Sequence, residues 1–120
     1  MPVTVRPILV TPDLDRLVAF YTRLLGAREV QRYPEDGPAF HVGLALGDSE
    51  FGIVRNTDVV PGDAGRVLLS IDVPDVEALL PRVGELGGTA TSGANDMPWG
   101  QRVAHIKDPD GNVANLTQEL

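Results

Sequence analysis

The same order of helix and strand signals occurs twice along this 120-residue chain, and this internal repeat constrains the fold more than any other feature. Apolar residues with the spacing of one helix face appear in each half, and the first residues of the two stripes, Leu14 and Val76, are 62 positions apart. Both segments begin with Pro beside Asp and end on glycine, as helices often do. The stripes consist of Leu14, Leu17, Val18, Tyr21 and Leu24 in the first half, and of Val76, Leu79, Leu80, Val83 and Leu86 in the second.

Two residues bear on where these helices begin and end. Thr11, which is followed by Pro12, is predicted to be the N-cap of the first helix. Pro81 falls inside the second helix, where a proline removes one hydrogen bond and clashes with the preceding turn. We therefore expect a kink or an early break at Pro81.

Strand-like runs precede and follow each helix. They cover residues 3–10, 39–46 and 50–55 in the first half, and residues 66–73, 101–107 and 112–117 in the second. This order predicts an α+β fold of two tandem βαβββ modules, residues 1–56 and 65–120, within a single domain spanning 1–120. We expect a curved mixed sheet with the helices on its outer face. The Gly/Pro-rich segments 56–65 and 91–98 are expected to be a linker and a surface loop.

Composition excludes several kinds of function. The chain has no cysteine, which excludes disulfides, thiolate nucleophiles and cysteine-ligated metals. Its formal charge of −7 argues against binding nucleic acid phosphates, although such a charge most simply keeps a small protein in solution. The sequence shows no apolar run long enough to cross a bilayer and no signal-peptide pattern. We therefore expect a cytoplasmic protein with neither nucleic acid nor membrane as a partner.

Three segments resemble the vicinal oxygen chelate superfamily, which includes glyoxalases, extradiol dioxygenases and bleomycin resistance proteins. They are "DLDRLVAFYTRLLG", "DVEALLPRVGELGG" and "PWGQRVAHIKDPDGNVANL", and the resemblance covers essentially the whole chain. The first strand, "RPILVTPD", is similar to that of the bleomycin resistance branch. This resemblance implies an acidic homodimer, with or without exchange of the N-terminal strands. It also implies that the dimer sequesters a drug at its interface and carries no metal or other cofactor.

In the enzymes of this superfamily, four side chains from four strands hold a divalent metal. The resemblance places those four positions at Arg6, Gly52, Leu68 and Asn115. Glycine and leucine offer no donor, arginine is a permanent cation, and asparagine is a neutral amide. The resemblance therefore predicts a metal site that has been lost.

Alternation along the strands from these positions predicts a mainly apolar pocket wall with a few polar groups. The expected wall is formed by Arg6, Ile8, Val10, Gly52, Val54, Leu68, Ser70, Val113, Asn115 and Thr117. Helix and sheet packing does not account for Tyr33, Phe40 and Trp99, so we expect them to stack on a planar ligand. An alternative interpretation is that Trp99 plugs the end of the sheet.

The other polar candidates have simpler interpretations. The acidic pairs Asp13/Asp15 and Asp108/Asp110 fit helix capping and turn geometry. His41 and His105 lie in apparent strands without a defined role.

Two functions follow from these observations. The first is a metal-free binding protein that confers self-resistance by sequestering a bleomycin-, mitomycin- or enediyne-type natural product. The second is a glyoxalase-type lyase or isomerase, or a dioxygenase-related enzyme, with an atypical site that could use Arg6, His41 or His105. Metal content and recovery of an unchanged ligand distinguish the two.

Overall fold

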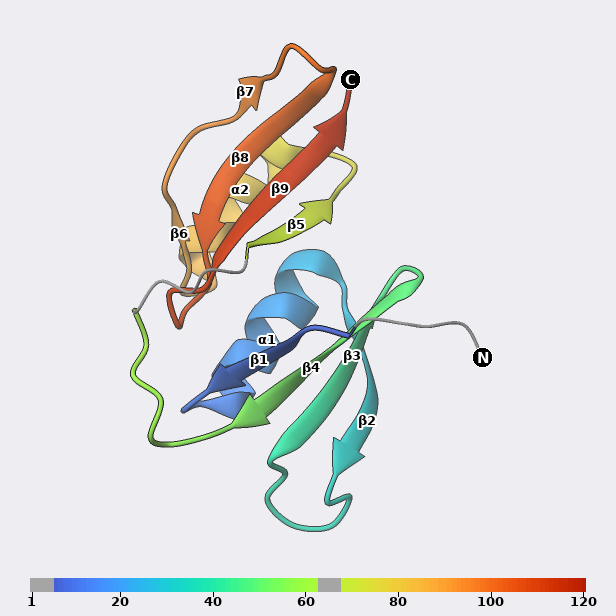
Figure 1. Ribbon diagram of the computed structural model, residues 1–120, viewed down its shortest axis with the longest axis vertical. Coiled ribbons are helices and arrows are strands. Elements are labelled where there is room, and N and C mark those ends of the chain that lie inside the picture. Colours follow the sequence, from blue (N-terminus) through green and yellow to red (C-terminus); the bar gives the residue numbers. More distant parts are fainter. Residues whose placement is uncertain (1–5, 63–67) are drawn as a thin grey trace. The chain divides into compact units, whose positions relative to one another are not determined.

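Each half of the chain folds into one helix packed on one face of its own sheet, as the computed structural model shows for residues 6–62 and 68–120 (Figure 1). The chain divides into two compact units, Met1–Val60 and Pro61–Leu120. The expected strands 3–10 and 66–73 and the expected linker 56–65 therefore extend in part outside the described residues. Whether the two units behave as a single domain stays a prediction.

The first unit has the predicted βαβββ order. Its sheet has the strand order β1-β4-β3-β2, in which β1 and β4 are parallel and the other neighbours are antiparallel. Strand β2 had not been identified as a separate run in the sequence. The elements are β1 (Ile8–Thr11), α1 (Leu14–Leu25), β2 (Arg28–Tyr33), β3 (His41–Leu46) and β4 (Ser49–Arg55).

The second unit repeats this plan, but its second strand, which follows the helix, is divided in two. Its sheet has the order β5-β9-β8-β6, and β7 also pairs with β8. The segment 91–98, predicted to be a surface loop, therefore contains a short strand that continues the sheet edge. The elements are β5 (Leu69–Asp72), α2 (Val76–Glu85), β6 (Thr89–Ala90), β7 (Asn95–Asp96), β8 (Gln101–Lys107) and β9 (Val113–Glu119). The described strands thus form two mixed sheets, each with parallel and antiparallel pairs, and the predicted α+β class is confirmed.

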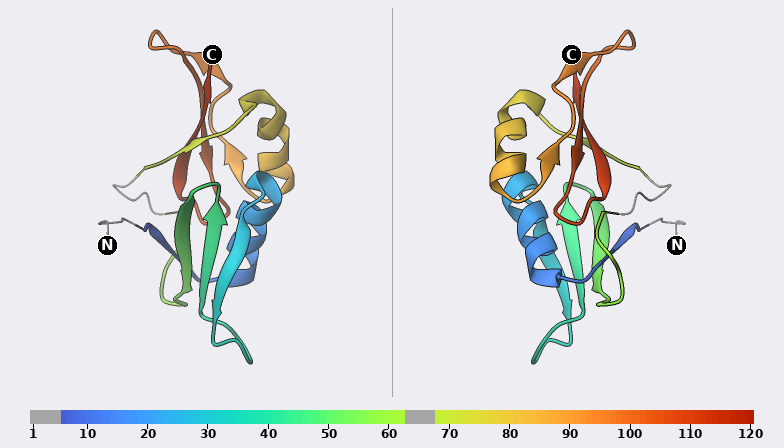
Figure 2. Two further views of the ribbon diagram at one scale, coloured as in Figure 1. Left: turned by 90° about the vertical axis from the view of Figure 1, so that its right-hand side faces the viewer. Right: turned by 90° about the vertical axis from the view of Figure 1, so that its left-hand side faces the viewer.

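The core of the first unit lies between α1 and strands β3 and β4, and Figure 2 shows the helix to one side of the sheet. Phe20 and Tyr21 are fully buried, and the Tyr21 ring meets Phe51 edge-on with centroids 5.3 Å apart. From the strands, Val42, Leu44 and Ile53 are buried beneath the helix. Burying side chains of this size contributes about 1.5–3 kcal/mol each, which fixes the face of the sheet that α1 covers.

The core of the second unit is built in the same way from fewer helix residues. Only Val76 and Val83 of α2 are fully buried, whereas Leu79, Leu80 and Leu86 of the predicted stripe are half-buried. Beneath the helix, the sheet contributes Ala104, Ile106, Ala114 and Leu116.

The predicted N-cap of α1 was wrong by two residues. Asp13 is the N-cap, and its side chain accepts a hydrogen bond from the Arg16 backbone N–H at 3.2 Å. Thr11 is instead fully buried, and its hydroxyl oxygen accepts a hydrogen bond from the Asp13 N–H at 3.0 Å. Thr11 thus orients the residue that caps the helix, because its own backbone still belongs to β1.

The early break expected at Pro81 was also wrong. Helix α2 continues through Pro81 to Glu85. A proline in this position removes one backbone hydrogen bond, but the buried Val76 and Val83 stand on either side of it and hold both halves of the helix on the sheet.

Candidate functional site

The sheet face of the first unit that α1 does not cover carries exposed apolar side chains. Ile8 lies beside Gly52, and Val10 lies beside Val54, in the parallel pairing of β1 with β4. Ile8 is 57% exposed and Val10 is 40% exposed, whereas Thr11, next in the chain, is fully buried on the helix side. The alternation predicted for these residues is therefore confirmed, and we call this surface the open face of the first unit.

Two glycines on neighbouring strands contribute no side chains of their own to the middle of this face. Gly43 and Gly52 are opposite each other in the antiparallel pairing of β3 with β4. A Cβ atom added at Gly52 would lie 3.4 Å from Nε2 of His41 and 3.6 Å from Cγ1 of Ile8. The imidazole of His41 therefore extends over Gly52, a position that strand alternation in the sequence could have indicated.

Tyr33 and Phe40 come together at the end of the β2–β3 hairpin. Their rings meet edge-on with centroids 5.4 Å apart, and the Phe40 N–H donates a hydrogen bond to the Tyr33 carbonyl at 3.0 Å. Tyr33 is paired with His41 across the strands, so it lies on the open face. The side chains remain 58% and 39% exposed, which leaves both rings available to a ligand.

Trp99 belongs to the second unit, in the turn before β8. Its indole N–H donates a hydrogen bond to Oε1 of Gln101 at 2.9 Å, and Gln101 in turn donates one to Glu119 at 3.0 Å. Trp99 is 67% exposed, so it does not plug the sheet of its own unit.

The uncovered face of the second unit carries a row of polar side chains. Ser70, Asn115 and His105 lie side by side on β5, β9 and β8. Nδ1 of His105 and Oδ1 of Asn115 are 2.5 Å apart. Asn115 thus forms a hydrogen bond with a histidine that the sequence analysis had left without a role. The tight turn between β8 and β9 could have indicated this contact, because it fixes the register that places the two residues opposite each other.

The four positions implied for metal ligands do not fit a divalent metal. Arg6 is exposed and forms a long ion pair with Glu50 at 4.0 Å, and Leu68 is exposed and apolar. Gly52 has no side chain, and Asn115 offers only a neutral amide already bonded to His105. Within residues 6–62 and 68–120, no group of three or more His, Asp or Glu side chains gathers in a way that could hold a metal ion.

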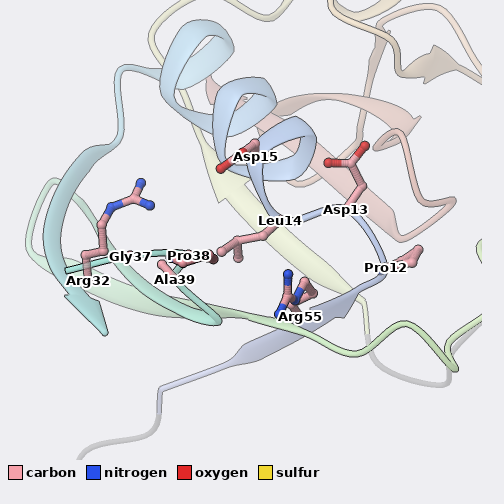
Figure 3. Close-up of a pocket in the computed structure, with 9 residues that line it drawn as sticks. All are labelled: Pro12, Asp13, Leu14, Asp15, Arg32, Gly37, Pro38, Ala39 and Arg55. Carbon is pink, nitrogen blue, oxygen red and sulfur yellow. The ribbon is translucent and has the colours of Figure 1, made fainter. Parts of the chain in front are cut away.

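A separate pocket of about 290 Å³ opens at the start of α1 (Figure 3). Asp13 and Asp15 approach it from the helix, and Arg32 and Arg55 approach it from the strands. Arg32 is paired with the buried Val42, so this pocket lies on the helix side of the sheet, away from the open face. Its two guanidinium groups and two carboxylates balance in charge. The whole lining consists of Pro12, Asp13, Leu14, Asp15, Arg32, Gly37, Pro38, Ala39 and Arg55.

Ion pairs shift the pKa of two surface carboxyl groups. Arg32 donates hydrogen bonds to both oxygens of Glu29, at 3.1 and 2.6 Å, and thereby holds the pKa of Glu29 below its ordinary value. Arg102 lowers the pKa of Asp96 in the same way, through a 2.7 Å hydrogen bond. Both pairs are structural contacts at sheet edges.

The two acidic pairs have the structural surroundings expected from the sequence. Asp13 caps α1, and Asp15 lies in its first turn. Asp108 accepts hydrogen bonds from the backbone N–H groups of Asp110 and Asn112 at 2.9 and 3.0 Å, which closes the turn between β8 and β9.

Neither described helix has the length and apolar character that crossing a bilayer requires.

Solved structures with the same fold come from proteins with different properties. TioX from Micromonospora sp. ML1 is 25% identical, with a TM-score of 0.74 over 98% of this chain and 100% of that chain. A bleomycin-binding protein from bleomycin-producing Streptomyces verticillus, solved with copper(II)-bleomycin, is 22% identical, with a TM-score of 0.65 over 100% and 98% of the two chains. A glyoxalase/bleomycin resistance protein/dioxygenase family enzyme from Burkholderia phytofirmans PsJN is 24% identical, with a TM-score of 0.78 over 94% and 95%.

The family comparison covers nearly the whole chain. The family model described as the Glyoxalase/Bleomycin resistance protein/Dioxygenase superfamily matches residues 3–116. That span includes both helices and all the strands of the two units apart from the end of β9. The chain therefore belongs to the glyoxalase/bleomycin resistance protein/dioxygenase superfamily.

Proposed function

We propose that this protein is a metal-free binding protein that confers self-resistance by sequestering a natural product of the bleomycin, mitomycin or enediyne type. The observation that carries this proposal is the open face of the first unit. There, Ile8, Val10 and Tyr33 expose apolar surface around a pair of glycines.

The chemistry of this face favours a planar and partly apolar ligand. The Tyr33 and Phe40 rings form an edge-to-face pair that leaves ring surface free for stacking. Ile8 and Val54 add aliphatic surface on the neighbouring strands β1 and β4, and the imidazole of His41 lies over Gly52 between them and the rings. Pockets for small molecules are generally lined in this way, with few polar groups among apolar ones.

The four former metal positions support binding over catalysis, because Arg6, Gly52, Leu68 and Asn115 supply no set of donors for a metal ion. The bleomycin-binding protein among the structural relatives is compatible with this function. We further propose a cytoplasmic homodimer, in which the second chain covers apolar surface that one chain leaves exposed.

An enzymatic function is the second candidate, because a family enzyme shares the fold. It would operate through an atypical site, without a metal at these positions, and could use Arg6, His41 or His105. Recovery of a chemically changed ligand after incubation with the protein would favour this candidate.

The test is a binding screen with copper(II)-bleomycin, metal-free bleomycin, a mitomycin and an enediyne, measured by calorimetry. We expect one compound to bind and to be recovered unchanged. Tyr33→Ala and Phe40→Ala should each weaken that binding at least about tenfold, since aromatic anchors typically contribute 2 kcal/mol or more. Val60→Ala is the matched control, because Val60 is also exposed but lies outside both sheets. Turnover of the compound, or binding unaffected by both aromatic substitutions, would contradict the proposal.

A further inference from the structure

The contact between His105 and Asn115 fixes the hydrogen-bonding character of the imidazole. Oδ1 of Asn115 is an acceptor without a hydrogen, so Nδ1 of His105 must carry the proton across the 2.5 Å contact. A neutral imidazole protonated at Nδ1 has an unprotonated Nε2, which is a hydrogen-bond acceptor. Asn115 therefore selects one of the two tautomers of His105.

The backbone of His105 is held just as closely, by the segment that interrupts the sheet edge between β6 and β7. The Thr91 N–H and hydroxyl both donate to the His105 carbonyl, at 2.9 and 3.1 Å. The His105 N–H donates to the Ser92 hydroxyl oxygen at 3.0 Å. Interruptions of this kind commonly occur beside functional sites, where they direct a side chain.

Two polar atoms of this pair have no partner within the described part of the chain. No hydrogen bond reaches Nε2 of His105 or Nδ2 of Asn115 there, although the ring of His105 is exposed. The pairing of β8 with β9 extends over seven residue pairs, so the two strands do not need this side-chain contact to hold together. An oriented acceptor and a free amide donor therefore stand next to each other on the uncovered sheet face.

We propose that His105 and Asn115 form a recognition site for an amide group of the ligand. A ligand N–H donates to Nε2 of His105, and the ligand carbonyl accepts from Nδ2 of Asn115. This inference rests on the binding function proposed above and assigns polar recognition chemistry to the sheet face of the second unit. A neutral primary amide presents an N–H and the carbonyl oxygen on the same side, whereas a trans secondary amide directs them to opposite sides and a tertiary amide lacks the N–H.

The first test needs no drug. Two-dimensional ¹⁵N NMR that correlates the ring nitrogens with the ring protons identifies the tautomer of each histidine in the intact protein. We expect His105 to be protonated at Nδ1, and we expect Asn115→Ala to remove this preference. His41 serves as the internal control, because its signals should not change. Protonation of His105 at Nε2 in the unsubstituted protein would overturn the proposal.

The second test compares benzamide with N,N-dimethylbenzamide, which keeps the ring and the carbonyl but has no N–H. Titrations followed by NMR should show benzamide shifting the His105 and Asn115 side-chain signals. The dimethyl compound should bind at least about fivefold more weakly, as expected for the loss of one hydrogen bond. Asn115→Ala and His105→Gln should abolish this discrimination, whereas Lys107→Gln, exposed on the same strand, should preserve it.

Equal binding of the two compounds, or no specific shift up to the solubility limit of benzamide, would refute the amide site. These outcomes are separate from the drug screen. A screen without any binder rejects the sequestering function and leaves a measured benzamide preference intact. A tight drug whose affinity is unchanged in both Asn115→Ala and His105→Gln rejects the amide site alone.

Discussion

Replacing Trp99 by alanine separates a ligand contact from a structural role, because the indole is only about one-third buried in its own unit. Its exposed fraction is 67%, and its N–H donates one hydrogen bond, to Gln101. Complete burial of a large apolar side chain contributes about 1.5–3 kcal/mol, so one-third of it contributes roughly 1 kcal/mol. The hydrogen bond adds about 1 kcal/mol at most in this exposed setting. The free energy of unfolding should therefore fall by about 1–2 kcal/mol, which corresponds to roughly 4–8 °C in Tm for a chain of this length.

The second expected effect of Trp99→Ala is a loss of ligand affinity. Aromatic anchors of binding sites cost roughly 2 kcal/mol or more when truncated, and 1.4 kcal/mol corresponds to a tenfold change. Trp99→Ala should thus weaken binding of the compound found in the screen at least about tenfold. Trp99→Phe keeps an aromatic ring and loses the bond to Gln101, so it should retain most of the affinity.

The assay uses the fact that Trp99 is the only tryptophan in the chain. Its fluorescence in the unsubstituted protein should change on titration with ligand, and calorimetry gives the affinities of the two variants. Thermal unfolding provides the stability of each. An affinity that is unchanged in Trp99→Ala, together with tryptophan emission that does not respond to saturating ligand, would refute the placement of Trp99 at the site.

Four further outcomes are expected. The purified protein should contain no stoichiometric transition metal, and elemental analysis near one metal per chain would contradict this. Light scattering should report a homodimer at micromolar concentration, and a monomer would refute it. Gly111→Ala should destabilise the protein by about 1 kcal/mol more than Gly100→Ala. Both glycines have φ near 90°, where an L residue costs about 1–2 kcal/mol, but only the Cβ at position 111 would come within 2.8 Å of the Gly62 backbone; equal losses in urea unfolding would contradict this. Glu29 should titrate below an ordinary glutamate by NMR, and Arg32→Gln should raise its pKa. Because the pKa of Glu29 is lowered in the folded state, the stability that the Glu29–Arg32 ion pair contributes is present above the unfolded-state pKa of Glu29. It is lost as the pH falls through the folded-state pKa.

The spacing of apolar residues determined the fold class and the repeat. In the first helix, Leu14, Leu17, Tyr21 and Leu24 are all buried as the stripe predicted. Helical and strand periodicities are properties of neighbouring residues, so the sequence shows them without knowledge of distant contacts. The same holds for the exposed Val10 beside the buried Thr11, since alternation along one strand assigns each residue to a face.

The prediction that a metal site of the superfamily type is missing also comes from the sequence, because it needs only the residue types at the four positions that the resemblance implies. The further expectation that those four positions and the predicted aromatic residues line one pocket does not follow from residue types. Tyr33 and Phe40 do meet in the first unit, while Trp99 and Asn115 belong to the second. Their common participation in one site stays a prediction for the binding experiments.

The tertiary structure decided the features that depend on contacts between elements. Helix α2 passes through Pro81 because Val76 and Val83 pack on the sheet on both sides of it, a gain that local helix propensity does not include. The hydrogen bond of Asn115 with His105 arises because the β8–β9 register places the two residues opposite each other and their rotamers bring Nδ1 and Oδ1 together. The turn restricts the register, but residue order does not specify the rotamers, since these depend on how the side chains pack in the folded unit.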